Sequence, residues 1–398
     1  MLNHNFRFRK LSKKLKEIGW SLSEKPQLTE MRKSVVTGKP TIGIISLSPL
    51  DYFNYLLPEE IFQQIVDWTN ELHVQDQFEP LCVSDLYRWL GSLIIFMVFG
   101  LRDYKHLWWK KRYIFQYENK SRSLSYRRWI WITSHLQCNK VELRDKLSST
   151  WKSYFKAGTN ITVDESRITA HHLDSGMLKY NKEKPERWAV EFVTLNDTYS
   201  GYLLDFTLPK EFSTQKAVEF LVKRMRSPRM HHHITADSGS ISLAHSLDNL
   251  GFYCTLNCRK NTAPTQLWDK LQQDLPKWHS RFVKNERLVV GVYHRKKFLN
   301  MVTNFFSLKE SFKAPGGKER KKVLNYYDDT KRAADQFNRL WTNFHCDHGH
   351  KKLDQAILIG WLEWGLCNAF ILHKHHSPQT ALSHKEFLFS ISKELLLL

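Results

Sequence analysis

The chain has 398 residues, and its 60 Lys and Arg outnumber its 40 Asp and Glu, which gives a formal net charge of +20. This positive charge favours a polyanionic partner, and nucleic acid is the first candidate. Hydrophobic residues make up 42% of the chain and six residues are cysteine, which excludes a disordered protein and a disulfide-rich secreted scaffold.

The first part of the chain is predicted to be helical after a basic arm. Residues 1–45 are basic and weakly periodic, and we expect them to be loosely ordered. Residues 46–150 have helical periods and are predicted to form an all-α region for DNA binding or dimerisation. One apolar face is expected within 58–72, made of Ile61, Ile65, Trp68 and Leu72. The most apolar run, 90–101, is too short to cross a bilayer, so we predict a buried helix and no membrane partner.

The period changes to that of β-strands after residue 156. Three runs rich in β-branched and aromatic residues predict strands, at 160–164, 187–196 and 201–208. A helix, a strand that ends at Asp237, a second helix and another strand follow, up to residue 258. This order predicts an α/β fold, in which a mixed sheet carries helices on its faces.

The last third of the chain returns to helix after an insertion. Residues 259–322 are predicted to form an insertion subdomain with one helix and two strands. Two helical patterns follow, over 328–344 and 354–375. The insertion divides the predicted α/β core into two segments, 155–258 and 323–375. The last residues, 376–398, are predicted to form a weak carboxy-terminal tail.

Two predicted strands end at a carboxylate, and a later helix carries a third. The first strand is expected to end at Asp164 and Glu165, the second ends at Asp237, and Asp335 lies on the helix of 328–344. Three such carboxylates make an oxygen site of the kind that holds Mg²⁺ or Mn²⁺. Two of these ions can activate the attacking oxygen and stabilise the leaving oxygen of a phosphodiester. Aspartates in turns and helices are also ordinary solvated residues, so both interpretations stay open.

The sequence around these aspartates resembles that of the piggyBac family of DNA transposases, over roughly residues 48–375. The stretch "ITVDES" (161–166) is similar to the first catalytic motif of that family, and "ITAD" (234–237) falls on its second aspartate. The stretch "YDDTKRAAD" (327–335) resembles the motif that carries the third. Two other stretches, "KEKPERW" (182–188) and "CRKN" (258–261), resemble further motifs of the family.

The resemblance implies a ribonuclease H-like catalytic core with an insertion subdomain, and cut-and-paste transposition of DNA. It makes Asp164, Asp237 and Asp335 the catalytic residues and the ligands of Mg²⁺ or Mn²⁺, which would compensate the paired charges at the end of the first strand. Double-stranded DNA is the expected partner, and a second copy of the chain, giving a homodimer, is a further candidate. Because the partner is genomic DNA, a nuclear location is expected.

Departures from the family pattern leave other interpretations open. Ser238 stands where the family has Asn, and Arg332 replaces a glycine before the third aspartate. Arg332 is expected either to pair with Asp335 or to hold a DNA phosphate. No Cys follows Cys367, so the cysteine-rich zinc module of many family members is not expected here. The alternatives are a domesticated or decayed transposase that binds DNA without cutting it, and a basic RNA-binding or structural protein.

Basic residues near these motifs are the candidate DNA contacts: Arg127, Arg128, Lys184, Arg259, Lys260 and Arg332. The stretch 126–135 is predicted to place Trp129 and Trp131 in the core, while its two arginines contact phosphate or form a solvated helix face. Another cluster offers either zinc-type ligands or a helix-end loop that contacts DNA: His345, Cys346, His348 and His350.

Overall fold

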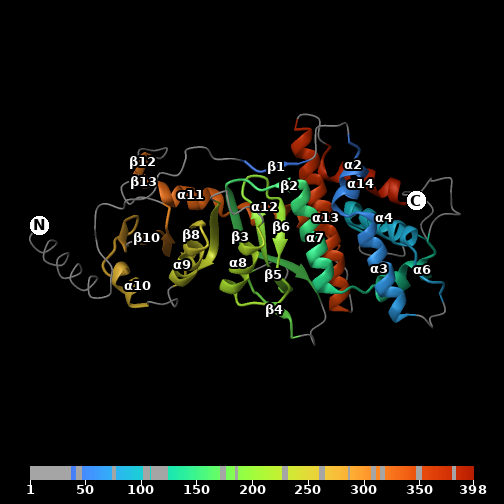
Figure 1. Ribbon diagram of the computed structural model, residues 1–398, viewed down its shortest axis with the longest axis horizontal. Helices are drawn as coiled ribbons and strands as arrows, with labels where there is room; N and C mark the ends of the chain where they lie inside the picture. Colours follow the sequence, from blue (N-terminus) through green and yellow to red (C-terminus); the bar gives the residue numbers. More distant parts are fainter. Residues whose placement is uncertain are drawn as a thin grey trace, which may run out of the picture.

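The computed structural model describes these residues: 37–41, 47–73, 78–101, 108, 124–170, 176–183, 187–225, 232–259, 265–285, 287–305, 311–313, 319–346, 352–378 and 382–398. They form an elongated molecule with helices at one end and a large sheet that extends toward the other (Figure 1). Most of the predicted arm over 1–45 lies outside the described residues.

The helical end consists of α2 (Pro49–Leu56), α3 (Glu59–Leu72), α4 (Val83–Phe99), α6 (Tyr126–His135) and α7 (Lys140–Tyr154). The region predicted to be all-α is therefore helical where it is described. Helix α4 is apolar around most of its circumference, and 12 of its 17 residues are buried. Ile61 and Ile65 of α3 are buried as predicted, but Leu72 is 68% exposed because α3 ends at this residue.

The nine-stranded mixed sheet forms the middle of the molecule. Its first strands are β3 (Asn160–Thr169), β4 (Leu178–Tyr180), β5 (Trp188–Asp197), β6 (Leu203–Phe206), β7 (His233–Gly239) and β8 (Tyr253–Cys258). Strands β3, β7 and β8 are adjacent and parallel, whereas β5 lies antiparallel to β3. Parallel neighbours require crossover connections, which α8 (Thr214–Lys223) and α9 (Ile241–Asn249) provide.

The predicted insertion continues this sheet. After α10 (Thr265–Gln272), β9 (Ser280–Lys284), β10 (Val289–His294) and β11 (Phe298–Thr303) add to the edge of β8 in the order β8-β11-β10-β9. Strand β9 was not predicted, because its five residues alternate too briefly to give a clear period. A separate two-stranded ribbon pairs β12 (Ser311–Lys313) with β13 (Glu319–Lys321). The sheet therefore extends without a break from β4 to β9.

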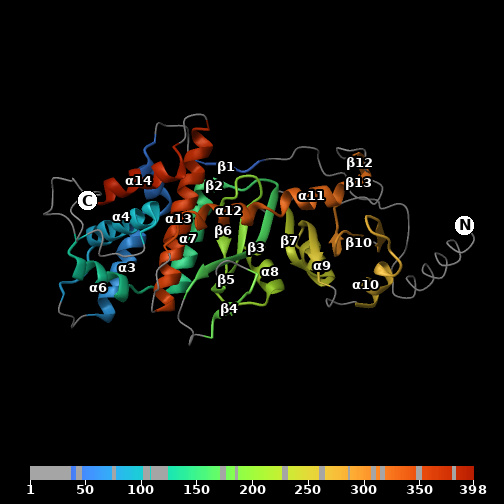
Figure 2. The ribbon, with the colours of Figure 1, turned by 180° about the vertical axis from the view of Figure 1, so that it is seen from behind.

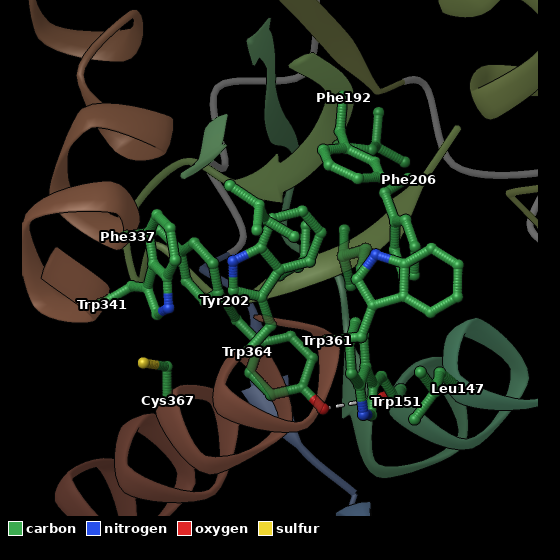
Figure 3. Packing of buried hydrophobic residues seen from close by; sticks show 14 of the residues in the cluster. Leu147, Trp151, Phe192, Tyr202, Phe206, Phe337, Trp341, Trp361, Trp364 and Cys367 are labelled. Atoms are coloured by element: carbon green, nitrogen blue, oxygen red, sulfur yellow. Dashed lines mark hydrogen bonds between the residues drawn. The ribbon is translucent and has the colours of Figure 1, made fainter. Parts of the chain in front are cut away.

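A long buried helix, α13 (Leu353–His376), lies between the helical end and the sheet (Figure 2). Its length and composition would allow it to cross a membrane, but its most apolar stretch is 100% buried inside the protein, as in a core helix. Trp361 and Trp364 pack against Phe206 of β6, with ring centroids 5.2 and 5.3 Å away (Figure 3). The two ends of the molecule thus share one hydrophobic core.

The predicted weak tail contains a well-formed helix, α14 (His384–Leu395). Ser383 and Glu386 form a capping box that satisfies backbone N–H groups at its start. One face is fully buried against α4 and α2, with Phe387, Ile391 and Leu395 recurring at every fourth position. This spacing is a helical signal, so the prediction of a weak tail was wrong for these residues.

Candidate active site

The first aspartate lies inside β3, where one of the two neighbouring strands stops pairing. The backbone pairing of β3 with β7 ends at Val163 and Ala236, but its pairing with β5 continues as far as Thr169. The prediction that the strand ends at Asp164 and Glu165 was therefore wrong. Asp164 is half-buried because β5 covers one side of its strand, while the side toward β7 has no paired neighbour.

The second aspartate lies in a β-bulge of β7. Between two successive paired positions, β7 advances from Ala236 to Gly239 while β8 advances from Leu256 to Cys258. Three residues therefore oppose two, and Asp237 and Ser238 lie in the resulting irregularity. Asp237 is exposed there, at the same edge of the sheet as Asp164 in the adjacent strand. The predicted strand end is thus a bulge inside a longer strand.

The third aspartate lies in the first turn of a helix that was predicted to be continuous with the helix before it. The predicted helix over 328–344 is two helices, α11 (Lys322–Thr330) and α12 (Ala333–Thr342), separated by Lys331 and Arg332. Asp335 lies in the first turn of α12, where the partial positive charge of a helix start favours a carboxylate. Within the described residues neither Arg332 nor Asp335 forms an ion pair, and both side chains are exposed. The expected pairing between them is therefore not formed.

A buried hydroxyl network fixes the point where α11 ends. Thr162 of β3 donates its hydroxyl to the carbonyl of Thr330 at 2.5 Å, so this carbonyl has a partner outside the helix. The Thr330 hydroxyl lies 2.8 Å from that of Thr235 on β7. The end of α11 is thus attached to the two strands that carry the first two aspartates, just before the break that precedes the third.

Helix α12 is also held at its other end. Trp341 donates its indole N–H to Glu363 of α13 at 2.7 Å, and the backbone N–H of Cys346 donates to the same carboxylate at 2.8 Å. Burial raises the pKa of Glu363 to about 7, although both hydrogen bonds and the charge of His345 act in the opposite direction. Asn338 donates to the carbonyl of Glu165 on β3 at 3.2 Å, which fixes α12 against the sheet.

The charges of Asp237 and Asp335 act on Asp164. Burial is the largest cause that raises the pKa of Asp164, to about 7, and the negative charges of Asp237, Asp335 and Glu165 raise it further. The backbone N–H of Glu165 donates to Asp164 at 2.8 Å and opposes the shift. The fold therefore brings together negative charges from β3, β7 and α12, so that ionising all of them at once is unfavourable.

Asp237 has two hydrogen-bond donors. The hydroxyl of Tyr327 on α11 donates to Oδ1 of Asp237 at 2.5 Å, and the side chain of Asn257 on β8 donates to the same oxygen at 2.8 Å. Burial and the charge of Asp237 raise the pKa of Tyr327, so its hydroxyl stays protonated and remains a donor. Sequence reasoning missed both donors. The third motif could have identified Tyr327, its first residue, whereas nothing in the sequence singles out Asn257.

The donor set fits a divalent cation in its chemistry. Three carboxylates supply the oxygen ligands that Mg²⁺ prefers, and a cation would neutralise the repulsion that raises the pKa of Asp164. Among the described residues, however, no group of three or more His, Cys, Asp or Glu side chains is arranged so that it could hold a metal ion. The residue types and charges therefore fit the metal, while the side chains do not have the arrangement of a formed metal shell.

The pKa of Asp164 makes a prediction for the metal-free protein. Between about pH 4 and pH 7 the folded protein keeps a proton on Asp164 that the unfolded chain releases, so stability falls as the pH rises through this range. Asp164→Asn should remove this dependence and raise the free energy of unfolding at pH 8 by roughly 1–3 kcal/mol, discounted because the group is half-buried. Urea unfolding in EDTA at pH 5 and pH 8 measures it. Equal differences between variant and wild type at both pH values would contradict it.

The predicted DNA contacts differ in their accessibility. Arg127 is exposed on α6, and Arg259 is exposed directly after β8. Arg128 is 11% exposed, pairs with Asp85 at 2.7 Å and donates to two backbone carbonyls, so it stabilises the helical end. Lys184 and Lys260 lie outside the described residues. Trp129 and Trp131 are buried as predicted.

The His and Cys cluster is described in part. His345 lies with Nδ1 2.9 Å from the carbonyl of Thr342, and the side chain of Cys346 is partly buried. His348 and His350 lie outside the described residues, so the choice between zinc ligands and a helix-end loop stays a prediction.

Comparison with known proteins gives a family and a fold. A family model described as Transposase IS4 matches residues 48–370. The cryo-EM structure of a piggyBac transposase synaptic complex with hairpin DNA is similar to this chain, with a TM-score of 0.77 and 19% identity over 90% of this chain and 82% of that one. The similarity confirms the mixed α/β fold with a ribonuclease H-like core. The search of curated proteins gave no match.

Proposed function

Because the chain belongs to the Transposase IS4 family, we propose that it cuts and joins DNA strands at a metal site built from Asp164, Asp237 and Asp335. The observation that carries the proposal is the raised pKa of Asp164, to which the charges of both other aspartates contribute. A half-buried carboxylate that two other carboxylates repel does not add to stability without a counter-charge, which favours a functional role for Asp164.

The residues of the site have distinct roles in this proposal. Two Mg²⁺ ions bound there would activate an attacking oxygen and stabilise the leaving oxygen of a phosphodiester. Asp164 supplies a carboxylate whose partial burial strengthens its attraction for a cation. Asp237 presents a carboxylate oriented by Tyr327, and Asp335 lies on the exposed first turn of α12, where a DNA backbone has access. No side chain has to form a bond with the DNA.

Exposed basic residues close in sequence to the site support DNA as the substrate. Arg259 follows Asn257 by two residues, and Asn257 is bonded to Asp237, so the exposed arginine lies close to the site. Arg332 is exposed directly before α12 and is free of described ion pairs, which favours the phosphate role over pairing with Asp335. The similar piggyBac complex contains hairpin DNA, which also favours DNA. Genomic DNA as the substrate implies a nuclear location.

A protein that binds DNA without cutting it is the second candidate. The favouring observation is that the described carboxylates have no metal-holding arrangement. Under this candidate the charge of the chain binds the DNA backbone, while the carboxylates are no longer used. DNA affinity would then fall with salt as expected for phosphate contacts, and no strand would be broken.

Incubation with supercoiled plasmid separates the two candidates. The proposed enzyme should convert the plasmid to nicked and linear forms in Mg²⁺ or Mn²⁺, and EDTA should stop the conversion. Gel-shift titration of the same DNA in EDTA at several salt concentrations measures binding alone. Tight binding without any strand breakage in either metal would reject the enzyme and support the second candidate. Strand breakage that persists in EDTA would reject the metal site.

A further inference from the structure

The insertion carries two short basic and aromatic segments at one end of its strands. We call them together the insertion tip: 277–279, directly before β9, and 296–298, at the turn from β10 to β11. The backbone N–H of Trp278 donates to the carbonyl of His294 at 2.6 Å, and the N–H of His294 donates to the carbonyl of His279 at 3.0 Å. Because His294 of β10 is also paired with Phe298 of β11, the two segments lie side by side.

Two large aromatic side chains of the insertion tip are exposed. Trp278 is 62% exposed and Phe298 is 39% exposed. The ring of Phe298 packs on that of His294, with centroids 4.1 Å apart. Trp278 has a φ of +68°, which is strained for a bulky residue and free of strain for glycine. Neither burial nor the conformation of the turn therefore explains a tryptophan at this position.

The insertion tip is also strongly basic. Lys277, Lys296 and Lys297 are exposed, and within the described residues none of these three forms an ion pair. The stretch 276–298 contains seven Lys and Arg and a single acidic residue. Asp274 lies just before this stretch, and its charge acts on the arginine of β9. The charge of the insertion tip thus fits a polyanion.

The insertion tip is attached to helix α11. Arg295, in the turn from β10 to β11, forms an ion pair with Asp328 of α11. The next residue toward the start of this helix, Tyr327, donates its hydroxyl to Asp237. The insertion tip therefore has a fixed position relative to the end of β7, and its exposed rings lose little conformational freedom when they bind a ligand.

Exposed aromatic and basic side chains together recognise unpaired nucleotides. Lysines bind the phosphates of a single strand and of a duplex, so charge alone does not distinguish them. An aromatic ring binds the flat face of a base, and in a duplex these faces are covered by the neighbouring base pairs. Exposed rings in a basic surface therefore favour a strand whose bases are unpaired.

We propose that the insertion tip binds the unpaired bases of a DNA strand, with Trp278 and Phe298 stacking on the bases. Lys277, Lys296 and Lys297 contact the phosphates of the same strand. The inference rests on the proposed function in taking DNA as the partner, and it does not require that the DNA be cut. Cutting and joining of DNA produce strand ends, and a single-stranded end presents the base faces that these rings bind.

An exposed tryptophan elsewhere in the sheet provides a matched control. Trp188 is 42% exposed at the start of β5, whereas β9 is at the opposite end of the strand order. Its ring packs against that of Tyr180, with centroids 5.0 Å apart. Trp278→Ala and Trp188→Ala each remove one exposed indole and no charge. A non-specific effect of losing a surface tryptophan would therefore appear in both variants.

Fluorescence anisotropy titration of labelled DNA in EDTA tests the inference. One DNA is a duplex with a single-stranded overhang, and the other is a blunt duplex of the same total length. Trp278→Ala should weaken binding of the overhang DNA by roughly 5–150-fold, the usual loss for one stacked base, and should leave binding of the blunt duplex unchanged. Trp278→Phe, which keeps an aromatic ring, and Trp188→Ala should retain the affinity of the wild type for both DNAs.

Two further variants test the other parts of the insertion tip. Phe298→Ala should also weaken binding of the overhang DNA alone, and it tests the inference independently if Trp278→Ala does not fold. The double variant Lys296→Ala with Lys297→Ala should weaken binding of both DNAs and lower the salt dependence of binding, because it removes phosphate contacts. Thermal unfolding of each variant verifies that the titrated protein is folded.

The outcomes separate this inference from the proposed function. Overhang binding that is unchanged in both Trp278→Ala and Phe298→Ala, with a wild type that cuts plasmid, overturns the inference alone and leaves a protein as the partner of this surface. Equal losses for overhang and blunt DNA, or an equal loss in Trp188→Ala, also overturn it. A ribonucleotide overhang that binds more tightly than the DNA overhang overturns it in favour of RNA. A wild type that binds the overhang through Trp278 but cuts no plasmid rejects the enzyme and supports the inference.

Discussion

Asp335→Asn is expected to abolish metal-dependent cleavage of plasmid DNA. Asparagine keeps the size of the side chain and one oxygen, but it removes the negative charge that α12 contributes to the site. Changing a residue that merely orients a metal ligand costs 10–100-fold, so losing a ligand should slow strand breakage by more than roughly 100-fold. The fraction of supercoiled plasmid nicked with time in Mg²⁺ and in Mn²⁺ measures this loss.

A nearby carboxylate of the same motif is the control for this variant. Asp329 is exposed on α11 and accepts a hydrogen bond from Asn325 at 2.8 Å, so it is well solvated and lies outside the proposed site. Asp329→Asn should cut plasmid at the wild-type rate. Both variants should bind DNA in EDTA at least as tightly as the wild type, because each removes one negative charge. Equal cutting by Asp335→Asn and the wild type would remove Asp335 from the catalytic site.

Asp205→Asn is expected to destabilise the fold strongly. Asp205 is fully buried on β6 and pairs with Lys152 of α7 at 2.6 Å and with Arg224 at 2.8 Å. Burial raises the pKa of Asp205, but the two positive charges outweigh burial and lower the pKa below its ordinary value. Removing this carboxylate takes a fully buried counter-charge away from Lys152 and Arg224, although Arg224 keeps its ion pair with Asp145 at 2.9 Å. The free energy of unfolding at pH 7 should fall by about 3–5 kcal/mol.

An exposed ion pair gives the comparison for Asp205. Lys140 and Asp354 are 2.6 Å apart, with side chains that are 28% and 53% exposed. Asp354→Asn should change the free energy of unfolding by less than about 1 kcal/mol, because water screens such pairs. Urea unfolding of both variants at pH 7 measures the difference. Equal losses would show that burial of the ion pair on β6 contributes nothing to the contact between the helical end and the sheet.

The sequence predicted most elements because local period and local composition decide them. The β-branched and aromatic residues of 187–196 and the apolar run in 90–101 predict β5 and α4 from local sequence alone. The glycine at position 251 predicted the end of the helix before it. In the structure this glycine has a φ of +83°, as is typical of a residue that ends a helix. The aspartates were selected by their positions at strand ends and by the resemblance around them, and neither argument needed their distances.

The remaining features depend on contacts between distant residues. The break between α11 and α12 lies where Thr162, from another part of the chain, bonds to the carbonyl of Thr330, and no local pattern at 328–344 indicates this. The bulge at Asp237 depends on the register of β7 against β8. Strand β3 continues past Asp164 because β5 continues beside it. Local sequence therefore predicts elements well, but it does not predict where a neighbour extends, interrupts or distorts them.

The shared core has a consequence for synthesis on the ribosome. Helices α2 and α4 are made early, but they bury their apolar faces against α13 and α14, within 353–395. At roughly 5–20 residues per second, the nascent chain waits on the order of 15–60 s between these two parts. During this interval its first helices are exposed to chaperones and to other chains. Release of a shortened chain that lacks α13 would leave this apolar surface permanently uncovered.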